Sequence, residues 1–428
     1  MKKEINKTEL KERINLNYKR LAESDYYKIG EVFSPKDYDW QGDKEGRALL
    51  AFVSHYKISG KKIKCMEEMI EKLPDFLNSQ GFLGEEKSDV IIEQQLSGHS
   101  WLLRGLCEYY EQFGNTFVLE TINNIVNNLF LPTKNLYSTY PIDRSENNQG
   151  GVSGSEIGLI GNWRLSSDVG CAFMSIDGLS HAYKVTKNNA VKELLDEMIE
   201  VYLSIDKVSL CVQTHCTLTA ARGMLRLYSL LGDTKYLNGA ADIFELYTNN
   251  GGMTYTYQNL NWWGRPDTWT EPCAVIDSLM VAVELYKITK SENYRKIAAR
   301  IYHNGFATLQ RNNGGAGTDT VITKESPWDS LKVHMFEAPF CCSMRLAEGL
   351  WYVNENIDLL YAELEDKPTK NKNGVYMSGD IIYSLADESL LEYAEEVIEI
   401  DGLRLCPIVK YYKVPENLIL STSQKIIF

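Results

Sequence analysis

Three cysteines and one glutamate, in two short segments, are the residues of this chain best suited to chemistry. Glu271 stands two residues before Cys273, and the adjacent pair Cys341 and Cys342 follows much later in the sequence. Three thiolates and one carboxylate make a complete tetrahedral ligand set for zinc. A thiolate beside a metal ion is also a nucleophile at neutral pH, because the ion lowers the thiol pKa. The same set could therefore join two segments of the fold or break a covalent bond.

A structural interpretation of these cysteines is also open. Cysteine is often a buried apolar residue, and a glutamate before a helix often caps it. A closed site of one glutamate and three cysteines can also bind zinc for stability alone. Cys211 and Cys216 lack the spacing of a compact zinc knuckle, and we interpret them as core thiols. The adjacency of Cys341 and Cys342 favours zinc binding over a core role.

The elements that must bring the two segments together share a repeated helical pattern. Apolar residues recur every three or four positions, and each stretch ends in a tyrosine followed, after three further residues, by glycine or lysine. These repeats end at 56–60, 110–114, 183–187, 228–232 and 286–290, and a sixth, at 352–356, ends in asparagine. Glycine and asparagine tolerate the left-handed conformation that ends many helices, so each repeat predicts a helix end.

More charged amphipathic stretches alternate with these repeats and predict partner helices. They cover 65–77, 117–131, 190–203, 236–247 and 294–309, and residues 10–24 supply the sixth. Six antiparallel helix pairs can stack into an open solenoid or into a closed ring of inner and outer helices. Six pairs fit a closed ring well, so we expect an all-α protein with an (α/α)6 barrel.

Three long polar loops predict that the candidate residues meet at one mouth of that barrel. The loops span 138–167, 249–271 and 311–339, and the last two lead into the segments that contain Glu271 and Cys341. Loops at the end of a rigid scaffold commonly carry binding and catalytic residues. We therefore expect both halves of the ligand set to begin inner helices at the same rim.

The pattern changes after about residue 356 to short stretches rich in β-branched and aromatic residues. These stretches lie at 374–385, 390–400, 403–412 and 418–428, with turn residues between them. We expect two parts: a barrel over 1–356, which is the candidate catalytic domain, and a small β-rich segment over 357–428.

Charge and hydropathy argue against several kinds of partner. The net charge of −13 would repel nucleic-acid phosphates, and no basic cluster offsets it. No apolar run is long enough to predict a membrane span, and the hydrophilic N-terminus lacks the apolar core of a signal peptide. We therefore expect a cytoplasmic protein whose nine cysteines are reduced or bound to metal. A homodimer is left open.

The segment Glu271-Pro272-Cys273 with the Cys341-Cys342 pair, set on six helical hairpins, resembles the β-L-arabinofuranosidase family of glycoside hydrolases, once known only as a domain of unknown function. The family motif reads Glu-Thr-Cys, and its Cys-Cys pair usually continues Pro-Pro or Pro-Ser. Here Pro272 replaces the threonine, and Ser343-Met344 follows the pair. The resemblance covers roughly residues 40–355 and includes weaker landmarks at 40–42, 46–47, 98–99 and 302–305.

This resemblance implies an enzyme that hydrolyses O-glycosyl bonds in a short oligosaccharide or glycoside, with L-arabinofuranose as the sugar. It implies that Glu271, Cys273, Cys341 and Cys342 bind zinc and that Cys341 attacks the anomeric carbon. Covalent attack followed by hydrolysis gives net retention of configuration, so we expect a retaining enzyme.

The reaction also needs a carboxyl group that protonates the leaving oxygen and later activates water. The family places a glutamate after a Gly-Gly turn upstream of its Glu-x-Cys, but residues 251–270 contain no glutamate. Asp267 is the only acid in that loop, and a cap for a helix start at Trp269 is the alternative interpretation of it. Glu337 lies four residues before Cys341. These two residues are the candidate acids, and Asp168 on another rim segment is a fallback.

Polar groups that bind the substrate are also expected from the resemblance. When the family is aligned with this chain on the helix that ends at residue 232, the family's active-site histidine corresponds to Gln213. His215 lies two residues further on. His99 keeps the Gly-His helix start of the family. A polar residue at a helix start is also an ordinary structural feature, so both interpretations of His99 and His215 stay open.

An aromatic loop is the other candidate for substrate binding. Trp262 and Trp263 are adjacent in a loop rich in glycine and asparagine, where two neighbouring rings cannot easily both point inward. We expect them to form a platform for sugar stacking, although core packing is the alternative. Arg265 beside them could pair with a carboxylate or a hydroxyl-rich ligand.

Two other functions compete with a glycoside hydrolase. Another sugar enzyme of the α/α-barrel kind, an epimerase or unsaturated-uronide hydrolase, would rely on histidine or aspartate and leave the cysteines unexplained. A sugar-binding or structural barrel would use zinc only to pin two inner helices. Zinc content and activity on aryl glycosides distinguish the three.

Overall fold

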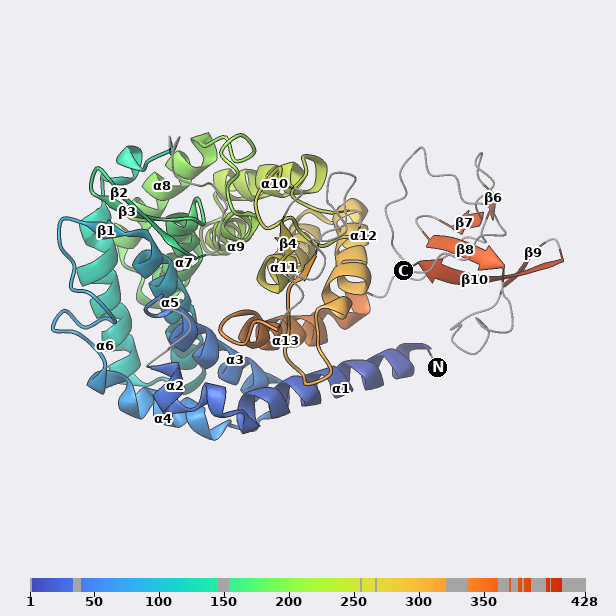
Figure 1. Ribbon diagram of the computed structural model, residues 1–428, viewed down its shortest axis with the longest axis horizontal. Coiled ribbons are helices and arrows are strands. Elements are labelled where there is room, and N and C mark those ends of the chain that lie inside the picture. Colours follow the sequence, from blue (N-terminus) through green and yellow to red (C-terminus); the bar gives the residue numbers. More distant parts are fainter. Residues whose placement is uncertain are drawn as a thin grey trace.

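The computed structural model describes residues 2–33, 40–142, 144, 154–254, 256–265, 268–320 and 337–360, with short pieces at 369–370, 376–378, 381–385, 398–400 and 402–409. Helices dominate these residues, and they form an (α/α)6 barrel with a small β-rich part after it (Figure 1). The candidate acid Asp267 lies outside the described residues.

A closed ring of inner helices forms the centre of the barrel. In the described part of the chain these helices are α3 (Asp43–Ser59), α5 (Glu93–Phe113), α7 (Ser175–Thr186), α9 (Thr214–Leu231), α11 (Pro272–Thr289) and α13 (Cys342–Leu360). Each packs against the next, and α13 packs against α3. The predicted closed barrel is therefore confirmed, and the open solenoid is excluded.

An outer helix packs on each inner helix. The outer helices are α1 (Lys2–Glu23), α4 (Lys64–Lys72), α6 (Thr116–Ile125), α8 (Asn189–Ser204), α10 (Thr234–Asn249) and α12 (Glu292–Arg300). Helix α1 packs on α13, and each of the others packs on the inner helix adjacent to it in sequence. Helix α8 shows why these segments are helices, because its apolar residues fall on one buried stripe: Val191, Leu194, Leu195, Met198, Ile199 and Tyr202.

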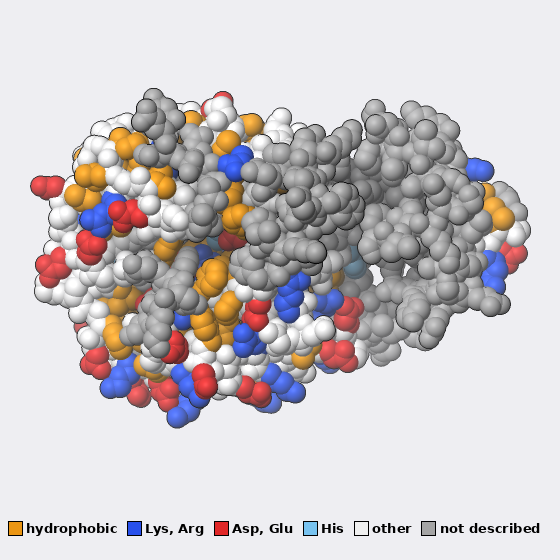
Figure 2. All heavy atoms as spheres, viewed as in Figure 1, with side chains coloured by type: hydrophobic (Ala, Val, Ile, Leu, Met, Phe, Trp, Pro, Cys, Tyr) orange, Lys and Arg blue, Asp and Glu red, His pale blue; other side chains and the backbone are white. Residues whose placement is uncertain are grey.

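Short helical segments extend or connect these helices. They are η1 (Asp25–Tyr27), α2 (Ile29–Val32), η2 (Leu73–Asp75), η3 (Val126–Phe130), η4 (Leu131–Thr133), η5 (Tyr137–Thr139), η6 (Cys171–Met174), η7 (Ile301–Gly305) and η8 (Phe306–Thr308). The η3 and η7 segments are π-helical and continue α6 and α12. Figure 2 shows acidic and basic side chains interspersed along the lower edge of the visible face, where α1 and α4 run in Figure 1.

Five of the six tyrosine repeats end helices as predicted. The residue four positions after the tyrosine has a positive φ, and its N–H donates to the tyrosine carbonyl, at Gly60, Gly114, Lys187, Gly232 and Lys290. The sixth prediction, a helix end at Asn356, is wrong. Helix α13 continues to Leu360 because the residues at its end, Ile357 and Leu360, are buried. The Asn356 side-chain Nδ2 donates to the Tyr352 carbonyl at 2.7 Å.

Two small sheets lie among the loops at the rim. Strand β1 (Ile91–Ile92) pairs in parallel with β3 (Trp163–Ser166), which pairs antiparallel with β2 (Glu156–Ile160). Strands β4 (Trp269–Thr270) and β5 (Asp319–Thr320) are antiparallel, with Trp269 opposite Thr320. The β4–β5 pair joins the loops that precede α11 and α13.

The C-terminal part is β-rich, as predicted. Its strands β6 (Thr369–Lys370), β7 (Tyr376–Ser378), β8 (Ile381–Leu385), β9 (Ile398–Ile400) and β10 (Leu403–Val409) form an antiparallel sheet in the order β6-β7-β8-β10-β9. The predicted strand over 418–428 lies outside the described residues. A domain boundary at residue 356 stays a prediction. Among the helices that the structure describes, none is long and apolar enough to cross a membrane.

Candidate metal centre

The four candidate ligands meet at the rim of the barrel, as predicted. One ligand atom from each of Glu271, Cys273, Cys341 and Cys342 lies within 4.8 Å of the other three. The Sγ atoms of Cys341 and Cys342 are 3.2 Å apart, and those of Cys273 and Cys342 are 3.8 Å apart. Two segments that are remote in sequence therefore present one carboxylate and three thiols to a common point.

Helix starts position these ligands. Glu271 is the N-cap of α11, and Pro272 occupies the first turn, where its fixed φ suits a helix and its missing N–H costs nothing. Cys341 directly precedes α13, and Cys342 is its first residue. The N-terminus of a helix carries partial positive charge, so both helices favour thiolates at these positions.

The loops before the two helices hold these starts in place. The backbone N–H of Glu271 donates to the Asn259 side-chain oxygen at 2.8 Å. The Ser343 hydroxyl accepts a 2.9 Å hydrogen bond from the Ala316 N–H and donates to Glu337 Oε1 at 3.0 Å. Since β4 and β5 also pair, both ligand segments are anchored to one another through the rim.

These residues fit a zinc ion. Cys273 and Cys342 are buried, and Glu271 Oε2 is a buried oxygen that has no hydrogen-bond partner among the described residues. Two sulfurs bound tetrahedrally to one zinc ion lie about 3.8 Å apart. The Sγ atoms of Cys273 and Cys342 have this spacing, whereas those of Cys341 and Cys342 are closer, at 3.2 Å. Three soft thiolates with one carboxylate are a donor set typical of zinc.

His215 lies between the ligand Glu271 and the buried carboxylate of Asp277. Its Nδ1 lies 3.2 Å from Glu271 Oε1, and its Nε2 lies 3.4 Å from Asp277 Oδ2. Burial alone would lower the pKa of His215, but the carboxylates of Glu271 and Asp277 raise it to about 10. Both ring nitrogens therefore face protein carboxylates, which argues against the predicted role in substrate binding and favours a role in orienting Glu271.

Arg47 of α3 contacts Cys273, another residue of the ligand set. Its Nη1 donates to Cys273 Sγ at 3.4 Å, and its Nε donates to Asp43 Oδ2 at 2.8 Å. Burial raises the pKa of the Cys273 thiol, but hydrogen bonds from the two neighbouring thiols and the positive charges of Arg47 and His215 lower it well below its usual value. Cys273 is thus the thiol of the three that most readily becomes a thiolate.

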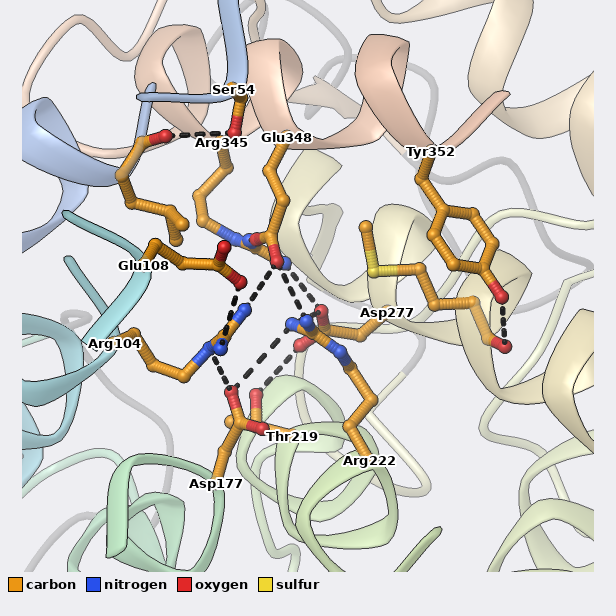
Figure 3. A network of polar contacts seen from close by, with 12 residues as sticks. Ser54, Arg104, Glu108, Asp177, Thr219, Arg222, Asp277, Arg345, Glu348 and Tyr352 are labelled. Carbon is orange, nitrogen blue, oxygen red and sulfur yellow. Dashed lines mark hydrogen bonds and ion pairs between the residues drawn. The ribbon is translucent and has the colours of Figure 1, made fainter. Parts of the chain in front are cut away.

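A network of buried ion pairs lies one helical turn deeper in the barrel (Figure 3). Asp277, one turn after Cys273, accepts hydrogen bonds from Arg222 at 2.7 Å and from Arg345 at 2.5 Å. Glu348 accepts from Arg104 and Arg222, each at 2.8 Å, and pairs with Arg345. These side chains are buried, and each is tolerated because it has partners of opposite charge.

The network also includes Asp177, which lies 3.1 Å from Arg104. Helices α5, α7, α9, α11 and α13 all supply charged side chains, which point toward one another in the barrel interior (Figure 3). On α11 and α13 these residues lie about one helical turn further along the helix than the thiols. A ligand would therefore reach the thiols from the rim. No local motif predicts the roles of these residues, although single charged residues in otherwise apolar inner-helix stretches are a signal for them.

His99 has a structural role. It is fully buried, its Nε2 accepts a hydrogen bond from the Leu83 N–H at 3.1 Å, and its Nδ1 bonds to the Gln95 carbonyl at 2.8 Å. Burial lowers its pKa to about 4. The expectation that His99 binds substrate is corrected, because the backbone occupies both of its nitrogens.

Trp262 and Trp263 do not form an exposed platform. Both rings are buried: Trp262 packs edge-on to Trp269, with ring centroids 5.0 Å apart, and Trp263 packs edge-on to Tyr247. The segment bridges to Gln213 in an extended conformation, which turns adjacent side chains to opposite faces. The expectation is corrected because both faces of this segment are covered by protein.

The remaining predicted residues, Gln213, Arg265 and Asp168, each make a local hydrogen bond within the rim loops. Gln213 caps α9, and its side-chain oxygen accepts from the Cys216 thiol at 2.8 Å. Arg265 is half-buried in the turn after Trp262, where its N–H donates to the Trp262 carbonyl at 3.3 Å. Asp168 is buried and accepts the Gly154 N–H at 3.1 Å.

Glu337 is held by three structural hydrogen bonds. Its Oε1 accepts from Arg20 at 2.9 Å and from Ser343 at 3.0 Å, and its Oε2 accepts from Asn313 at 2.6 Å. These bonds tie α1 and the rim loop to the start of α13. A carboxylate fixed in this way is poorly placed to move a proton between itself and a substrate.

Comparison with known proteins shows the class of fold. No protein-family model and no curated protein matches the sequence. A cellobiose 2-epimerase from Bacillus thermoamylovorans matches with a TM-score of 0.53 and 13% identity, over 80% of this chain and 99% of that chain. An unsaturated glucuronyl hydrolase from Streptococcus agalactiae matches with a TM-score of 0.55 and 12% identity, over 83% of this chain and 94% of that chain. The chain thus has the fold of the α/α-barrel enzymes that process sugars.

A GH127 β-arabinofuranosidase is also among the similar structures. Its TM-score is 0.52 at 12% identity, and the match covers 88% of this chain but 63% of that longer chain. The likeness to the predicted family is therefore one of fold.

Proposed function

We propose that this protein is a retaining glycoside hydrolase that uses a zinc-associated cysteine, Cys341, to cleave a short oligosaccharide or glycoside. The observation that carries the proposal is the convergence of Glu271 and three thiols at the mouth of an α/α barrel. Neither an epimerase nor a uronide hydrolase relying on histidine or aspartate would need that set. The resemblance of the cysteine motif suggests L-arabinofuranose as the sugar.

Exposure and contacts favour Cys341 as the nucleophile among the three thiols. Cys341 is 8% exposed, whereas Cys273 is 0% and Cys342 is 1% exposed. Cys273 also accepts a hydrogen bond from Arg47, which reduces the electron density on its sulfur. Zinc, when bound, would lower the pKa of the thiols so that a thiolate is present at neutral pH.

The chemistry requires two displacements at the anomeric carbon. Cys341 Sγ forms a bond to that carbon while the bond to the leaving oxygen breaks, and water then displaces the sulfur. A carboxyl group gives its proton to the leaving oxygen and later takes one from the water. Asp267 stays the candidate for this group, since Glu337 is engaged by Arg20, Asn313 and Ser343.

Polar atoms beside the centre support a ligand with many hydroxyl groups. Both side-chain polar atoms of Asn261 and the Thr268 hydroxyl are buried and have no hydrogen-bond partner in the described part of the chain. Asn261 pairs through its backbone with Thr214 at the start of α9 and with Trp269, two residues before Glu271. Buried polar groups need partners, and sugar hydroxyls would supply both donors and acceptors.

The second candidate function is a barrel in which zinc is purely structural. The engagement of Glu337 favours this candidate, because it removes one of the two predicted acids. Such a protein would bind zinc and sugars but would not turn over a glycoside. The cytoplasmic location, the carbohydrate partner and the lack of a nucleic-acid partner also stay predictions.

Metal analysis and activity on a panel of aryl glycosides test the proposal. We expect about one zinc per chain, release of the aryl group by the wild type, and a product that keeps the anomeric configuration in an NMR time course. Cys341→Ser should lower kcat at least a thousandfold, since it removes the bond-forming atom. Cys211→Ser, at a half-buried thiol outside the ligand set, is the matched control and should keep activity.

The outcomes separate the two candidates. Activity that survives Cys341→Ser with zinc still bound would exclude this residue as the nucleophile. A wild type that holds zinc but cleaves none of the glycosides would favour the structural barrel. A wild type without zinc would reject the metal centre itself.

A further inference from the structure

We propose that Arg47 is a positioning residue that keeps Cys273 as a fixed metal ligand and offsets the negative charge of the ligand set. This inference rests on the proposed zinc centre. Arg47 belongs to α3, a helix that supplies no ligand, and the residue is 3% exposed. Its contacts therefore reach across the barrel to a thiol of α11.

Three contacts fix the guanidinium in one orientation. Its Nε donates to Asp43 Oδ2 at 2.8 Å, one helical turn earlier on α3. Its Nη1 donates to Cys273 Sγ at 3.4 Å, and its Cζ lies 4.0 Å from the centroid of the Trp101 ring. Asp43 and Trp101 are fully buried, so Arg47 cannot turn towards solvent without leaving both of them behind.

The close approach of α3 and α5 builds this arrangement. A Cβ on Gly46 would lie 2.1 Å from the Trp101 carbonyl carbon, so no larger residue fits at position 46 without moving the helices apart. The absence of a side chain there lets the backbone of α5 come near, which brings the Trp101 ring under Arg47. The sequence Gly46-Arg47 thus serves both the packing and the contact with Cys273.

Charge explains why a cation is needed at this place. Zinc with three thiolates and one carboxylate carries a net charge of about −2, and a buried net charge is costly unless an opposite charge lies nearby. Arg47 remains protonated at every working pH and lies against the sulfur of Cys273. Asp43 accepts a hydrogen bond from Nε of the same guanidinium. Within this ion pair, Arg47 is therefore the residue that faces the metal centre.

The contact also distinguishes the three sulfurs. A charge-assisted hydrogen bond lowers the electron density of the thiolate that accepts it and makes it a poorer nucleophile. Arg47 makes this bond with Cys273, whereas Cys341 is the most exposed thiol of the set. Arg47 therefore favours Cys273 as the sulfur that stays on the metal and Cys341 as the sulfur that reacts.

Arg47→Met tests the inference, because methionine keeps much of the side-chain length but removes the charge and the donors. We expect zinc affinity, measured by competition with a chelator, to fall by about tenfold to a hundredfold. In the cobalt-loaded protein the sulfur-to-metal charge-transfer band should shift. Brief alkylation with iodoacetamide, mapped by mass spectrometry, should label mainly Cys341 among the three ligand thiols of the zinc-loaded wild type, and also Cys273 in the variant.

Two further variants separate positioning from stability. Arg47→Lys keeps the charge but cannot contact Asp43 and Cys273 together, so it should give an intermediate affinity and recover part of the band shift. Arg222→Gln removes another buried arginine, which contacts Asp277 and Glu348 but none of the thiols. It should lower stability while leaving the cobalt band and the alkylation pattern of the wild type.

The outcomes distinguish this inference from the proposal on which it rests. A wild type that binds zinc, with an Arg47→Met variant of unchanged zinc affinity, cobalt spectrum and alkylation pattern, would overturn the role of Arg47 alone. A band shift of equal size in Arg222→Gln would also overturn it, since the effect would then be structural. A wild type that binds no metal would overturn the zinc centre and the inference together.

Discussion

Single residues differ in how far the sequence reveals their role. Glu271 and the cysteine pair are recognisable because their types and local spacing suit one chemistry. Arg47 and His215 are not recognisable in this way, because they contact the ligand set from α3 and α9. No local pattern records a contact between helices that lie so far apart in the chain.

His99 illustrates the same limit. The Gly-His pair predicts a helix start there, but α5 begins at Glu93, so His99 lies inside the helix, and the backbone takes both of its nitrogens. Burial, rather than position in the sequence, decides its chemistry. A neutral buried histidine resists protonation, which links its role to the pH dependence of stability.

The substitution His99→Gln should flatten the pH dependence of stability on the acid side. Because the pKa of His99 is lowered to about 4 in the folded state, its contribution is complete above pH 6.5 and is lost as the pH falls towards 4. Between pH 7 and pH 5 the wild type should lose about 2 kcal/mol of unfolding free energy through this residue. Urea unfolding at both pH values measures the loss.

Glutamine suits this test because its amide can accept from Leu83 and donate to Gln95, as the imidazole does. His55 and His181 are also buried with pKa values lowered to about 4, so part of the acid sensitivity should persist in the variant. Equal losses of stability in wild type and His99→Gln would contradict the neutral buried histidine.

The helices were predictable where a local signal marks their ends. The tyrosine repeats locate five C-caps because the left-handed residue and its hydrogen bond are set within a few positions. The sixth prediction fails because tertiary burial of Leu360 extends α13 past its asparagine. Packing of the two tryptophans against separate faces of one loop segment was likewise decided by tertiary contacts.

Lys290→Gly should stabilise the protein by about 1 kcal/mol. Lys290 ends α11 with a φ of 57°, a conformation that costs a residue with a Cβ about 1 kcal/mol and costs glycine little. Lys287→Gly, inside the last turn of the same helix, is the matched control and should destabilise by a similar amount. Thermal unfolding of the three proteins measures both changes, and a lower Tm for Lys290→Gly would contradict the strained C-cap.

At the scale of the whole molecule, the barrel was predictable because six helix pairs with short connections have few ways to pack. The closed ring, the shared rim and the β-rich C-terminal part all agree with that expectation. The interior was not predictable, because the partners of each buried charge come from several helices. Residues such as Arg104 and Asp277 acquire their roles only when the ring has closed.

Removal of zinc should weaken the contact between α11 and α13, the last two inner helices of the ring. The candidate ligands belong to the starts of α11 and α13, so a bound ion would bridge two neighbouring inner helices. A chelator should lower the Tm of the wild type by several degrees, as expected for the loss of a tight ligand. The variant with both Cys341→Ser and Cys342→Ser is the control, and an equal effect of the chelator on that variant would contradict a zinc bridge.

The position of Glu348 late in the chain also affects the order in which the barrel folds during translation. Arg104, Arg222 and Arg345 all pair with Glu348, although two of them are made long before it. While a ribosome is still translating the chain, α5 and α9 carry arginines whose shared partner does not yet exist. Asp177 and Asp277 can already pair with these arginines, but the buried charges of the network are fully matched only when α13 supplies Glu348. The barrel is therefore completed by its last helix, and a nascent chain that stops before α13 should remain open.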